Sequence, residues 1–305
     1  MKKNGLRLTL VGLGDVGGTL LTALKLLGDE IGEIGIYDPY EPLIDRYCME
    51  LGQVLDRPTP RIVRREAENL FDCDIFLFAA SKGVPPVGAG GDVRLVQFAG
   101  NRELLKQYTR QARNTGFSGL FCQISDPVDL LCQCVYWQSN TDENGAFDGR
   151  GMQAGQVVGF GLGVMAARAQ YYARQQGLDP TKIAAFGPHG AGLVVANDLA
   201  QYDDALSLAL TKQTVQANHA VRALGFKPYI APALSSACIS LLNLLRGKPF
   251  YGAIPSDGVW FGCLARRTEQ GFAPLHDVST LPPQLRGRIE NAIRELKEWE
   301  PQCRL

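Results

Sequence analysis

The 305-residue sequence lacks a net charge, a basic block and any long apolar run. Lysine plus arginine and aspartate plus glutamate number 31 each, which argues against nucleic acids and anionic membrane surfaces as partners. The longest apolar stretches have the length of strands, so no segment is predicted to cross a bilayer. A hydrophobic content of 46% and a charged content of 20% are typical of globular proteins, and the length predicts two lobes.

The sequence also lacks the patterns that mark secretion, disulfide frameworks and metal sites. The start Met1-Lys2-Lys3 is similar to that of a signal peptide, but the apolar run after it breaks at Gly12, so we expect a cytoplasmic protein. None of the eight cysteines forms a Cys-x-x-Cys pair, and Cys132 and Cys134 would lie on different faces of a helix. We therefore expect reduced, structural cysteines and no bound metal.

A glycine pattern near the start is the strongest signal in the chain. The apolar, β-prone residues 7–11 lead directly into Gly-x-Gly-x-x-Gly, and an apolar segment of helical periodicity follows. In a dinucleotide-binding turn the first glycine allows the turn, the second allows a diphosphate to approach, and the third allows the helix to pack on the strand. We therefore predict cofactor contacts from this turn, at Gly12, Leu13, Gly14, Asp15, Val16 and Gly17.

Asp38 distinguishes this interpretation from that of an ordinary glycine-rich turn. It ends the apolar run 34–37 and follows Gly17 by 21 residues, where an acidic side chain accepts hydrogen bonds from an adenosine ribose. Because a carboxylate at this place would repel a 2′-phosphate, the sequence predicts NAD rather than NADP as the cofactor.

The order of the elements predicts an α/β fold. In the first half, strand-like and helix-like segments alternate, which is typical of a Rossmann-type doubly wound parallel sheet. The polar segment 139–149 predicts a boundary, so that residues 1–149 form the NAD-binding domain and residues 150–305 an α+β substrate domain. We expect strands at 7–11, 34–37, 61–63, 74–80, 119–125, 182–186, 249–254 and 258–265, and helices at 16–27, 41–55, 103–113, 164–176, 203–224, 234–245 and 284–299.

A glycine- and proline-rich segment, 83–92, follows the strand expected at 74–80. Open parallel sheets bind ligands at the carboxyl ends of their strands, so we interpret this segment as a mobile lid. Arg94 comes directly after it and is either a residue that closes with the lid or a surface residue that starts the next helix.

Together these motifs resemble the lactate/malate dehydrogenase family. The resemblance rests further on Arg94 with Asn101 seven residues later, and on Ser-Asp-Pro-Val-Asp at 125–129. It extends to Val-Val-Gly at 157–159, to Ala-Arg at 167–168, and to Gly-Pro-His-Gly at 187–190. The motifs keep the family's order from residue 7 to about 192, whereas the last third matches only in its expected elements. The resemblance implies a lactate/malate dehydrogenase-like fold, a homodimer or homotetramer, and further cofactor contacts at Ala79, Ala80, Asn101 and Ser125.

The resemblance also implies hydride transfer between the nicotinamide cofactor and a small 2-hydroxy or 2-oxo acid. His189 would be the acid/base, because the pKa of histidine lies near the working pH. Arg168 would hold the substrate carboxylate through two parallel hydrogen bonds, and Arg94 would polarise the carbonyl group. The residues alone also allow a structural role for each of the three, as a core histidine and two surface arginines.

Three departures from the family pattern predict an atypical substrate. Met165 stands where the family has the aspartate that orients the histidine, and Asp126 stands where it has an asparagine beside the substrate. We hypothesise that Asp126, a fourth candidate catalytic residue, takes over the role of the missing aspartate toward His189. The third departure is the loop, which is longer than usual and carries neither the glutamine suited to lactate nor the extra arginine suited to malate. Lys82 and Lys227 are then alternative cations for the substrate.

Two other functions are open at this point. A catalytically impaired NAD(H)-binding pseudoenzyme of the same fold is favoured by Met165 and Asp126. A glycosidase-like, NAD-dependent chemistry on this fold is the weaker alternative, because the metal ligands of such enzymes are not recognisable in the sequence.

Overall fold

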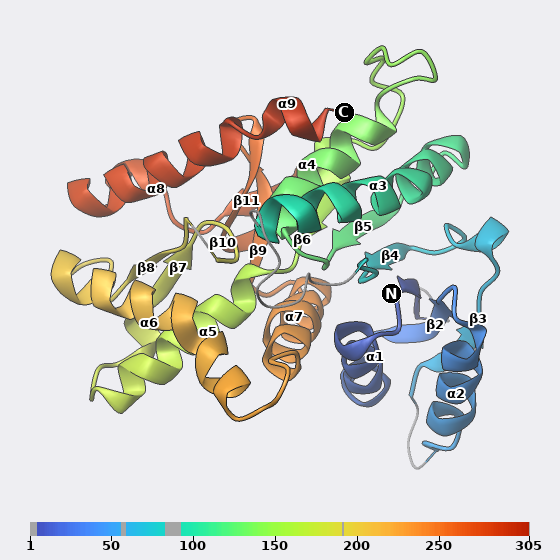
Figure 1. Cartoon of the computed structure of the whole chain (residues 1–305), viewed down its shortest axis with the longest axis horizontal. Coiled ribbons are helices and arrows are strands. Elements are labelled where there is room, and N and C mark those ends of the chain that lie inside the picture. The colour runs from blue at the N-terminus through green and yellow to red at the C-terminus, as the bar shows by residue number, and fades with distance from the viewer. Residues whose placement is uncertain (1–4, 56–58, 83–92, 191, 305) are drawn as a thin grey trace. The chain divides into compact units, whose positions relative to one another are not determined.

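The computed structural model describes residues 5–55, 59–82, 93–190 and 192–304, and within these all side chains except those of 93–96 (Figure 1). The described residues divide into two compact units, which are treated separately below. The first contains the residues up to Pro127, Leu131–Val158, and the C-terminal Cys303 and Arg304. The second contains Val128–Leu130 and the residues from Gly159 to Gln302. The assignment of residues 1–149 and 150–305 to two functional domains stays a prediction.

The first unit is built on a parallel sheet. Its strands are β1 (Leu6–Val11), β2 (Ile31–Tyr37), β3 (Arg61–Arg64), β4 (Ile75–Phe78), β5 (Leu120–Gln123) and the start of β6 (Val157–Gly159). They lie in the order β3-β2-β1-β4-β5-β6, and β1 pairs in parallel with both β2 and β4. Because the chain moves outward on both sides of β1, this is a Rossmann-type sheet, and the predicted fold class is confirmed.

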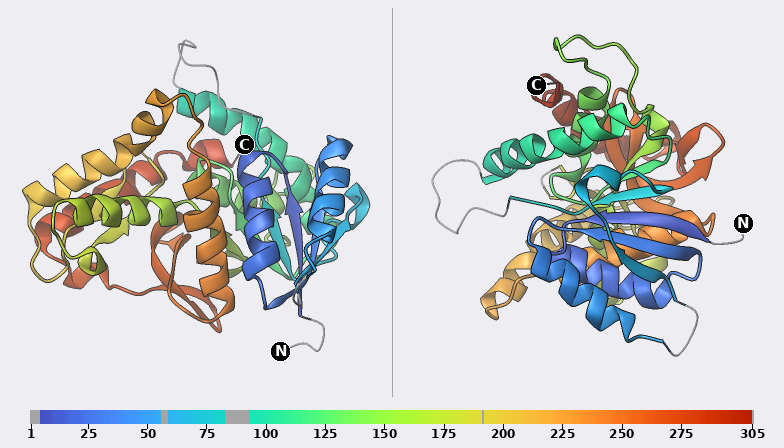
Figure 2. Two further views of the ribbon diagram at one scale, coloured as in Figure 1. Left: turned by 90° about the horizontal axis from the view of Figure 1, so that it is seen from below. Right: turned by 90° about the vertical axis from the view of Figure 1, so that its right-hand side faces the viewer.

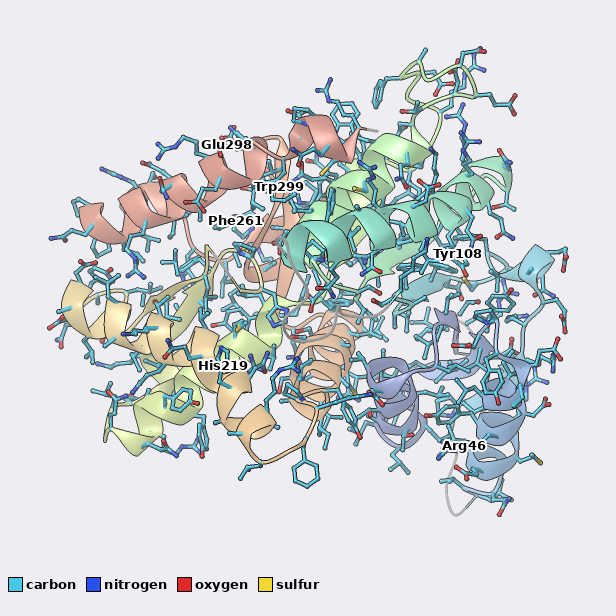
Figure 3. All side chains as sticks on the ribbon, viewed as in Figure 1. Arg46, Tyr108, His219, Phe261, Glu298 and Trp299 are labelled. Atoms are coloured by element: carbon cyan, nitrogen blue, oxygen red, sulfur yellow. The ribbon has the colours of Figure 1, made fainter. Side chains whose placement is uncertain are left out.

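Helices cover both faces of this sheet. They are α1 (Asp15–Leu27), α2 (Glu41–Gly52), α3 (Val93–Asn114) and α4 (Val128–Ser139), with short 3-10 turns at η1 (Ala67–Asn69) and η2 (Ala154–Gln156). Figure 2 shows α1 and α2 on one face and α3 on the other. The continuous apolar run of β4 is buried throughout, as predicted. Tyr108 of α3 (Figure 3) packs its ring 5.1 Å from that of Phe78 and 6.1 Å from that of Phe76.

Helix α3 begins ten residues earlier than the sequence indicated, at Val93 instead of residue 103. Gly100 and Asn101 disfavour a helix interior, so the local sequence favours a later start than the structure has. In the structure both lie in contact with the segment after β4. A Cβ built on Gly100 would lie 3.7 Å from the side chain of Lys82, and Asn101 is fully buried. Tertiary packing therefore overrides the local preference. The predicted lid, 83–92, lies outside the described residues.

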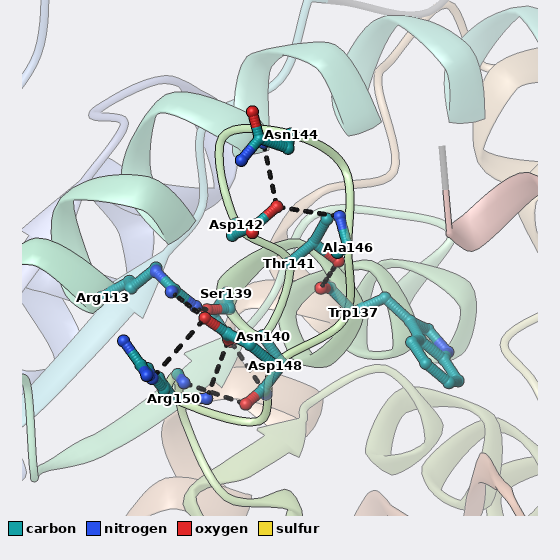
Figure 4. Close-up of polar contacts among 11 residues, drawn as sticks. Arg113, Trp137, Ser139, Asn140, Thr141, Asp142, Asn144, Ala146, Asp148 and Arg150 are labelled. Atoms are coloured by element: carbon teal, nitrogen blue, oxygen red, sulfur yellow. Dashed lines mark hydrogen bonds and ion pairs between the residues drawn. The ribbon is translucent and has the colours of Figure 1, made fainter.

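A polar loop leads from α4 to β6 and is fixed by Arg113, at the end of α3 (Figure 4). Its guanidinium binds both carboxylate oxygens of Asp148, at 2.8 and 2.6 Å, and donates to the carbonyl of Ser139 at 2.9 Å. This contact holds the pKa of Asp148 well below its usual range. Within the loop, Asp142 accepts hydrogen bonds from the backbone of Asn144 and Ala146. The polar segment is therefore an ordered connection.

The second unit has the α+β composition that the sequence predicts. Its helical elements are the first turn of α4, α5 (Leu162–Gln175), η3 (Pro180–Lys182), α6 (Asp204–Ala223), η4 (Pro232–Ile239), α7 (Ser240–Leu245), η5 (Val278–Thr280), α8 (Pro283–Lys297) and most of α9 (Glu300–Cys303). Its strands are β7 (Ala184–Phe186), β8 (Val194–Ala196), β9 (Phe250–Ser256), β10 (Val259–Thr268) and β11 (Gly271–Pro274). Strands β9, β10 and β11 form an antiparallel sheet, and β7 pairs with β8 as a hairpin.

Three features of the second unit differ from the sequence prediction. Strands β8 and β11 were not expected, because each is too short to show a periodic pattern. The helix expected at 234–245 begins at Pro232 and is a π-helix up to Ile239 before it continues as α7. Proline is tolerated there because the first turn of a helix has no use for its N–H. Among the described residues, no helix combines the length and the apolar character needed to cross a membrane.

Candidate active site

The turn between β1 and α1 has the geometry that its three glycines predict. A Cβ built on Gly12, where φ is +93°, would lie 2.4 Å from the backbone nitrogen of Ala80. A Cβ built on Gly17 would lie 1.8 Å from the carbonyl oxygen of Gly12, so strand and helix approach too closely for any side chain. A Cβ built on Gly14 would meet nothing within 4 Å. The turn thus has open space above the start of α1, where backbone N–H groups and the helix dipole favour a phosphate.

The residues next to these glycines, together with Asp38, complete the turn between β1 and α1. Leu13 is buried, and its backbone N–H donates to Oδ2 of Asp38 at 2.8 Å. The other carboxylate oxygen of Asp38 accepts from the backbone N–H of Tyr40 at 2.9 Å. Asp15 begins α1 with an exposed side chain, and Val16 is half-buried. Each oxygen of the Asp38 carboxylate has further lone pairs, so this fixed group can still accept from two ribose hydroxyls.

Asn101 and Ser125 tie together the ends of β4 and β5. The Oδ1 of Asn101 accepts from the Ser81 hydroxyl at 3.2 Å and the Lys82 backbone at 3.0 Å, and its Nδ2 donates to the carbonyl of Asp126 at 2.7 Å. The Ser125 hydroxyl donates to the carbonyl of Ala80 at 2.5 Å. These contacts shape the backbone beside Gly12. The predicted cofactor contacts of Ala79, Ala80, Asn101 and Ser125 stay predictions, and Asn101 and Ser125 have this structural role in addition.

Asp126 belongs to the same first unit. It is half-buried, is joined to Pro127 by a cis peptide bond, and its carbonyl is held by Asn101. Arg94 lies in the first turn of α3, and its side chain lies outside the described part of the chain. Lys82 is exposed. The hypothesis that Asp126 serves His189 stays a prediction.

His189 lies in the second unit, in the glycine-rich connection between β7 and β8. Gly187, where φ is +92°, donates through its backbone N–H to the carbonyl of Gly262 in β10 at 2.8 Å. A Cβ on Gly187 would lie 2.5 Å from the carbonyl oxygen of Gly192, which requires glycine at this turn. His189 is half-buried, and its Cβ lies 3.3 Å from a Cβ built on Gly161, the residue that precedes α5. The turn therefore presents His189 at the N-terminus of α5.

Arg168 lies on α5, two turns from that end, and is half-buried. Its Nη2 donates to Oδ1 of Asn218 on α6, and its Nη1 lies 3.8 Å from the sulfur of Met165. Met165 is 2% exposed and belongs to an apolar cluster with Leu162 and Val164. The residue that departs from the family pattern is thus a packed core side chain that also contacts the arginine. Arg168 and Met165 are thus in contact on α5, and His189 lies beside the residue that precedes the same helix.

Two residues of this site could not be identified from the sequence. Ser236 in η4 accepts a hydrogen bond from the backbone N–H of Val164 at 2.8 Å and donates to the carbonyl of Gly161 at 2.7 Å. It therefore caps the helix that carries Arg168. Asn218 binds Arg168 directly. Their partners lie 72 and 50 residues away in the chain, and no local motif marks such contacts.

The remaining titratable residues do not suggest another chemistry. His219 projects from the exposed surface of α6 (Figure 3), and the ring of His276 packs 6.5 Å from that of Phe186. Burial raises the pKa of Cys73 and Cys238 to about 11 and that of Cys263, beside Asp129, to about 12, so these thiols stay protonated at neutral pH. Within the described part of the chain, no three His, Cys, Asp or Glu residues gather in a way that could hold a metal ion.

Comparisons of the sequence find lactate dehydrogenases, and comparisons of the structure find lactate and malate dehydrogenases. No model of a known protein family matches the chain. An L-lactate dehydrogenase from Mesomycoplasma hyopneumoniae is 26% identical over 196 residues, which is 63% of this chain and 57% of that protein. L-lactate dehydrogenase 2 from Staphylococcus aureus is 27% identical over 195 residues, 62% of this chain and 56% of that protein. The chain therefore spans little more than half the length of the curated relatives it matches.

Solved structures match over nearly the whole chain. The minor L-lactate dehydrogenase from Enterococcus mundtii has a TM-score of 0.81 at 18% identity and covers 98% of this chain and 99% of its own. Malate dehydrogenase from Plasmodium falciparum has a TM-score of 0.77 at 14% identity and covers 98% of each chain. At such identities the likeness establishes the fold. The last third of the chain, which matched no motif, thus has the same fold as the corresponding part of these enzymes.

Proposed function

Because this chain is a divergent member of the lactate/malate dehydrogenase family, we propose that it transfers a hydride between NAD and an atypical 2-hydroxy or 2-oxo acid. The observation that carries the proposal is the placement of His189. The turn that holds it lies beside Gly161, the residue that precedes the helix that carries Arg168. This arrangement supports roles for His189 as the acid/base and for Arg168 as the carboxylate-binding cation, because the two residues belong to the same unit.

The first unit supplies features that fit NAD. Gly12 and Gly17 allow the close approach of strand and helix, Gly14 leaves space above the helix N-terminus, and Asp38 offers a carboxylate to a ribose. We infer NAD rather than NADP, because the Asp38 carboxylate would repel a 2′-phosphate. When bound, the nicotinamide would supply the site that accepts or gives the hydride.

Each residue of the second unit has a defined task in this reaction. His189 takes the proton of the substrate hydroxyl when the alcohol is oxidised and returns it when the carbonyl is reduced. Arg168 holds the substrate carboxylate bidentately, which fixes the hydroxyl-bearing carbon relative to His189. Arg94 would add positive charge beside the carbonyl oxygen, and Asp126 would lend His189 the negative charge that Met165 lacks.

The positions at which the chain departs from the family pattern support a substrate other than lactate or malate. Met165 is buried among apolar side chains, so the position of the usual orienting carboxylate holds an uncharged thioether. Lys82 and Lys227 are exposed, and we propose them as additional cations toward a substrate with more than one anionic group. The working form we propose is a homodimer or homotetramer in the cytoplasm.

Met165 also favours the second candidate, an NAD(H)-binding pseudoenzyme. In serine proteases, loss of the carboxylate that orients the catalytic histidine lowers the rate by about 10⁴. A chain with this substitution can still bind its cofactor without catalysing the reaction at a measurable rate.

A substrate screen separates the two functions. Purified protein is mixed with NADH and, in turn, pyruvate, oxaloacetate, 2-oxoglutarate, 2-oxobutanoate and phenylpyruvate, and the loss of NADH absorbance is followed. The enzyme reading predicts turnover with at least one acid, and a loss of at least about a hundredfold in His189→Asn. NADH binding by calorimetry with no turnover on any acid would instead identify the pseudoenzyme. Absence of NADH binding would contradict both.

A further inference from the structure

The C-terminal residues of the described chain belong to the first unit and contact one face of α4 (Figure 1). The thiols of Cys134 and Cys303 share a hydrogen bond, and the guanidinium carbon of Arg304 lies 4.0 Å from the ring centroid of Trp137. Cys134 and Trp137 are three residues apart on α4, so they belong to the same face of that helix. Two consecutive residues of the C-terminal segment therefore contact two residues that lie one helical turn apart.

The two cysteines are enclosed in the core of the first unit. Cys134 and Cys303 are both fully buried, and so is Val135 beside the first of them. Burial, and after it the neighbouring Cys303 thiol, raises the pKa of Cys134. Because the thiolate is the reactive form of cysteine, the pair resists oxidation while the C-terminal segment stays in place. Oxidation therefore requires that this segment open.

The positions of the two cysteines in the chain give their contact a long reach. The segment from Gly159 to Gln302 belongs to the second unit, and Cys134 and Cys303 stand before and after all of it. A covalent bond between the two sulfur atoms would close a loop of about 170 residues. Such a loop restricts the unfolded chain strongly, because the loss of unfolded-state entropy grows with loop length.

We propose that Cys134 and Cys303 are a redox-sensitive pair, which forms a disulfide with a small-molecule disulfide as the oxidant and thereby fastens the C-terminal segment to α4. Their sulfur atoms are already in contact, so bond formation requires little movement of the backbone. The inference goes beyond the proposed function and does not depend on it, because neither cysteine is among the residues assigned to the cofactor or the substrate.

The reaction proceeds by two thiol–disulfide exchanges. Chain ends open more readily than core helices, so Cys303 meets the oxidant first. Its thiolate attacks one sulfur of the oxidant, which forms a mixed disulfide and releases one thiolate. When the segment closes again, the thiolate of Cys134 attacks the Cys303 sulfur and releases the second thiolate. The protein loses two protons and two electrons, and the oxidant is reduced to two thiols.

The experiment maps the disulfide and measures its effect on unfolding. The full chain is incubated with oxidised glutathione, its remaining thiols are alkylated in denaturant, and the peptides of an unreduced digest are identified by mass spectrometry. We expect a peptide pair that joins Cys134 to Cys303 and is two hydrogens lighter than the sum of its parts. We also expect the unfolding temperature to rise by about 10 °C, and dithiothreitol to reverse the rise.

Three variants show whether the pairing is specific. Cys134→Ala and Cys303→Ala should each lose both the cross-link and the rise in unfolding temperature. Cys132→Ala is the matched control, because Cys132 is equally buried and lies two residues earlier on another face of α4. It should keep both.

Full alkylation of Cys134 and Cys303 after the incubation, or a glutathione adduct that never closes, would overturn the proposal. A cross-link that leaves the unfolding temperature unchanged would also overturn it, because the C-terminal segment would then not be fastened. The peptide map requires only the wild type, so it decides the question whether or not the alanine variants fold. None of these readouts involves NAD or a substrate, so failure here leaves the proposed function untouched.

Discussion

The hydroxyl of Ser236 caps the helix of Arg168, because it accepts a hydrogen bond from the backbone N–H of Val164 at 2.8 Å. The same hydroxyl donates to the carbonyl of Gly161, and the side chain is 2% exposed. Close packing accompanies the contact, since a Cβ on Gly163 would lie 2.4 Å from the carbonyl oxygen of Ser235. The start of α5, on which His189 also packs, is therefore fixed from outside the helix.

The first prediction concerns this cap. Ser236→Ala leaves two buried backbone groups without this partner, so the free energy of unfolding should fall by about 1–3 kcal/mol. Equilibrium denaturation measures the change. Ser118→Ala, at an exposed serine, is the control and should stay within about 0.5 kcal/mol of the wild type. Equal stability of the two variants would show that the hydroxyl does not hold the helix.

The second prediction separates folding from cofactor binding with two glycines of one turn. Gly17→Ala places a Cβ 1.8 Å from the Gly12 carbonyl oxygen, so it should lower both stability, by about 1–3 kcal/mol, and NAD affinity. Gly14→Ala meets nothing within 4 Å, so the fold should be unaffected while the methyl group obstructs the diphosphate. Thermal unfolding and NAD calorimetry on both variants test the pair. Unchanged NAD affinity in Gly14→Ala would place the diphosphate elsewhere.

The third prediction is a pH dependence of stability at the polar loop after α4. Arg113 holds the pKa of Asp148 well below its usual range. A carboxyl group with a lowered pKa in the folded state stabilises the fold above its unfolded pKa, near pH 4, and the effect is lost as the pH falls toward the folded value. The stability difference between wild type and Asp148→Asn should therefore be constant above about pH 5 and shrink below it. Arg113→Met should show the same dependence, and a difference that grows in acid would contradict the assignment.

The fourth prediction tests the hypothesis that Asp126 supports His189. Asp126→Asn restores the residue that the family has at this position but removes a negative charge. Turnover should fall, and the pH profile of kcat/KM should shift to lower pH, because the protonated histidine loses a stabilising charge. Unchanged turnover with an unchanged profile would remove Asp126 from the mechanism.

The parts of the site that could be predicted from sequence are those encoded locally. Gly12, Gly14, Gly17 and Asp38 keep a fixed spacing because strand, turn and helix follow one another directly in the chain. The alternation of strand-like and helix-like segments predicted the parallel sheet, because that pattern is also visible in consecutive segments of the chain. His189 stood out because a histidine between proline and glycine is an unusual core residue.

The contacts that escaped prediction join segments far apart in the chain. Asn218 and Ser236 look like ordinary polar residues of helices, and their partners on α5 are 50 and 72 residues away. Helix α3 is longer than the local sequence indicates: Gly100 and Asn101 disfavour a helix, whereas their packing beside Lys82 and Asp126 favours it. Tertiary contacts determine each of these features, and local secondary-structure propensities carry no information about such contacts.

The transfer of an isotope from cofactor to substrate tests the central claim most directly. NADH deuterated at the transferring position of the nicotinamide ring is incubated with the protein and each 2-oxo acid, and the products are analysed by mass spectrometry. The account predicts a 2-hydroxy acid with deuterium on its hydroxyl-bearing carbon, formed by the wild type and at least about a hundredfold more slowly by His189→Asn. NADH binding without any deuterated hydroxy acid from the wild type would contradict it.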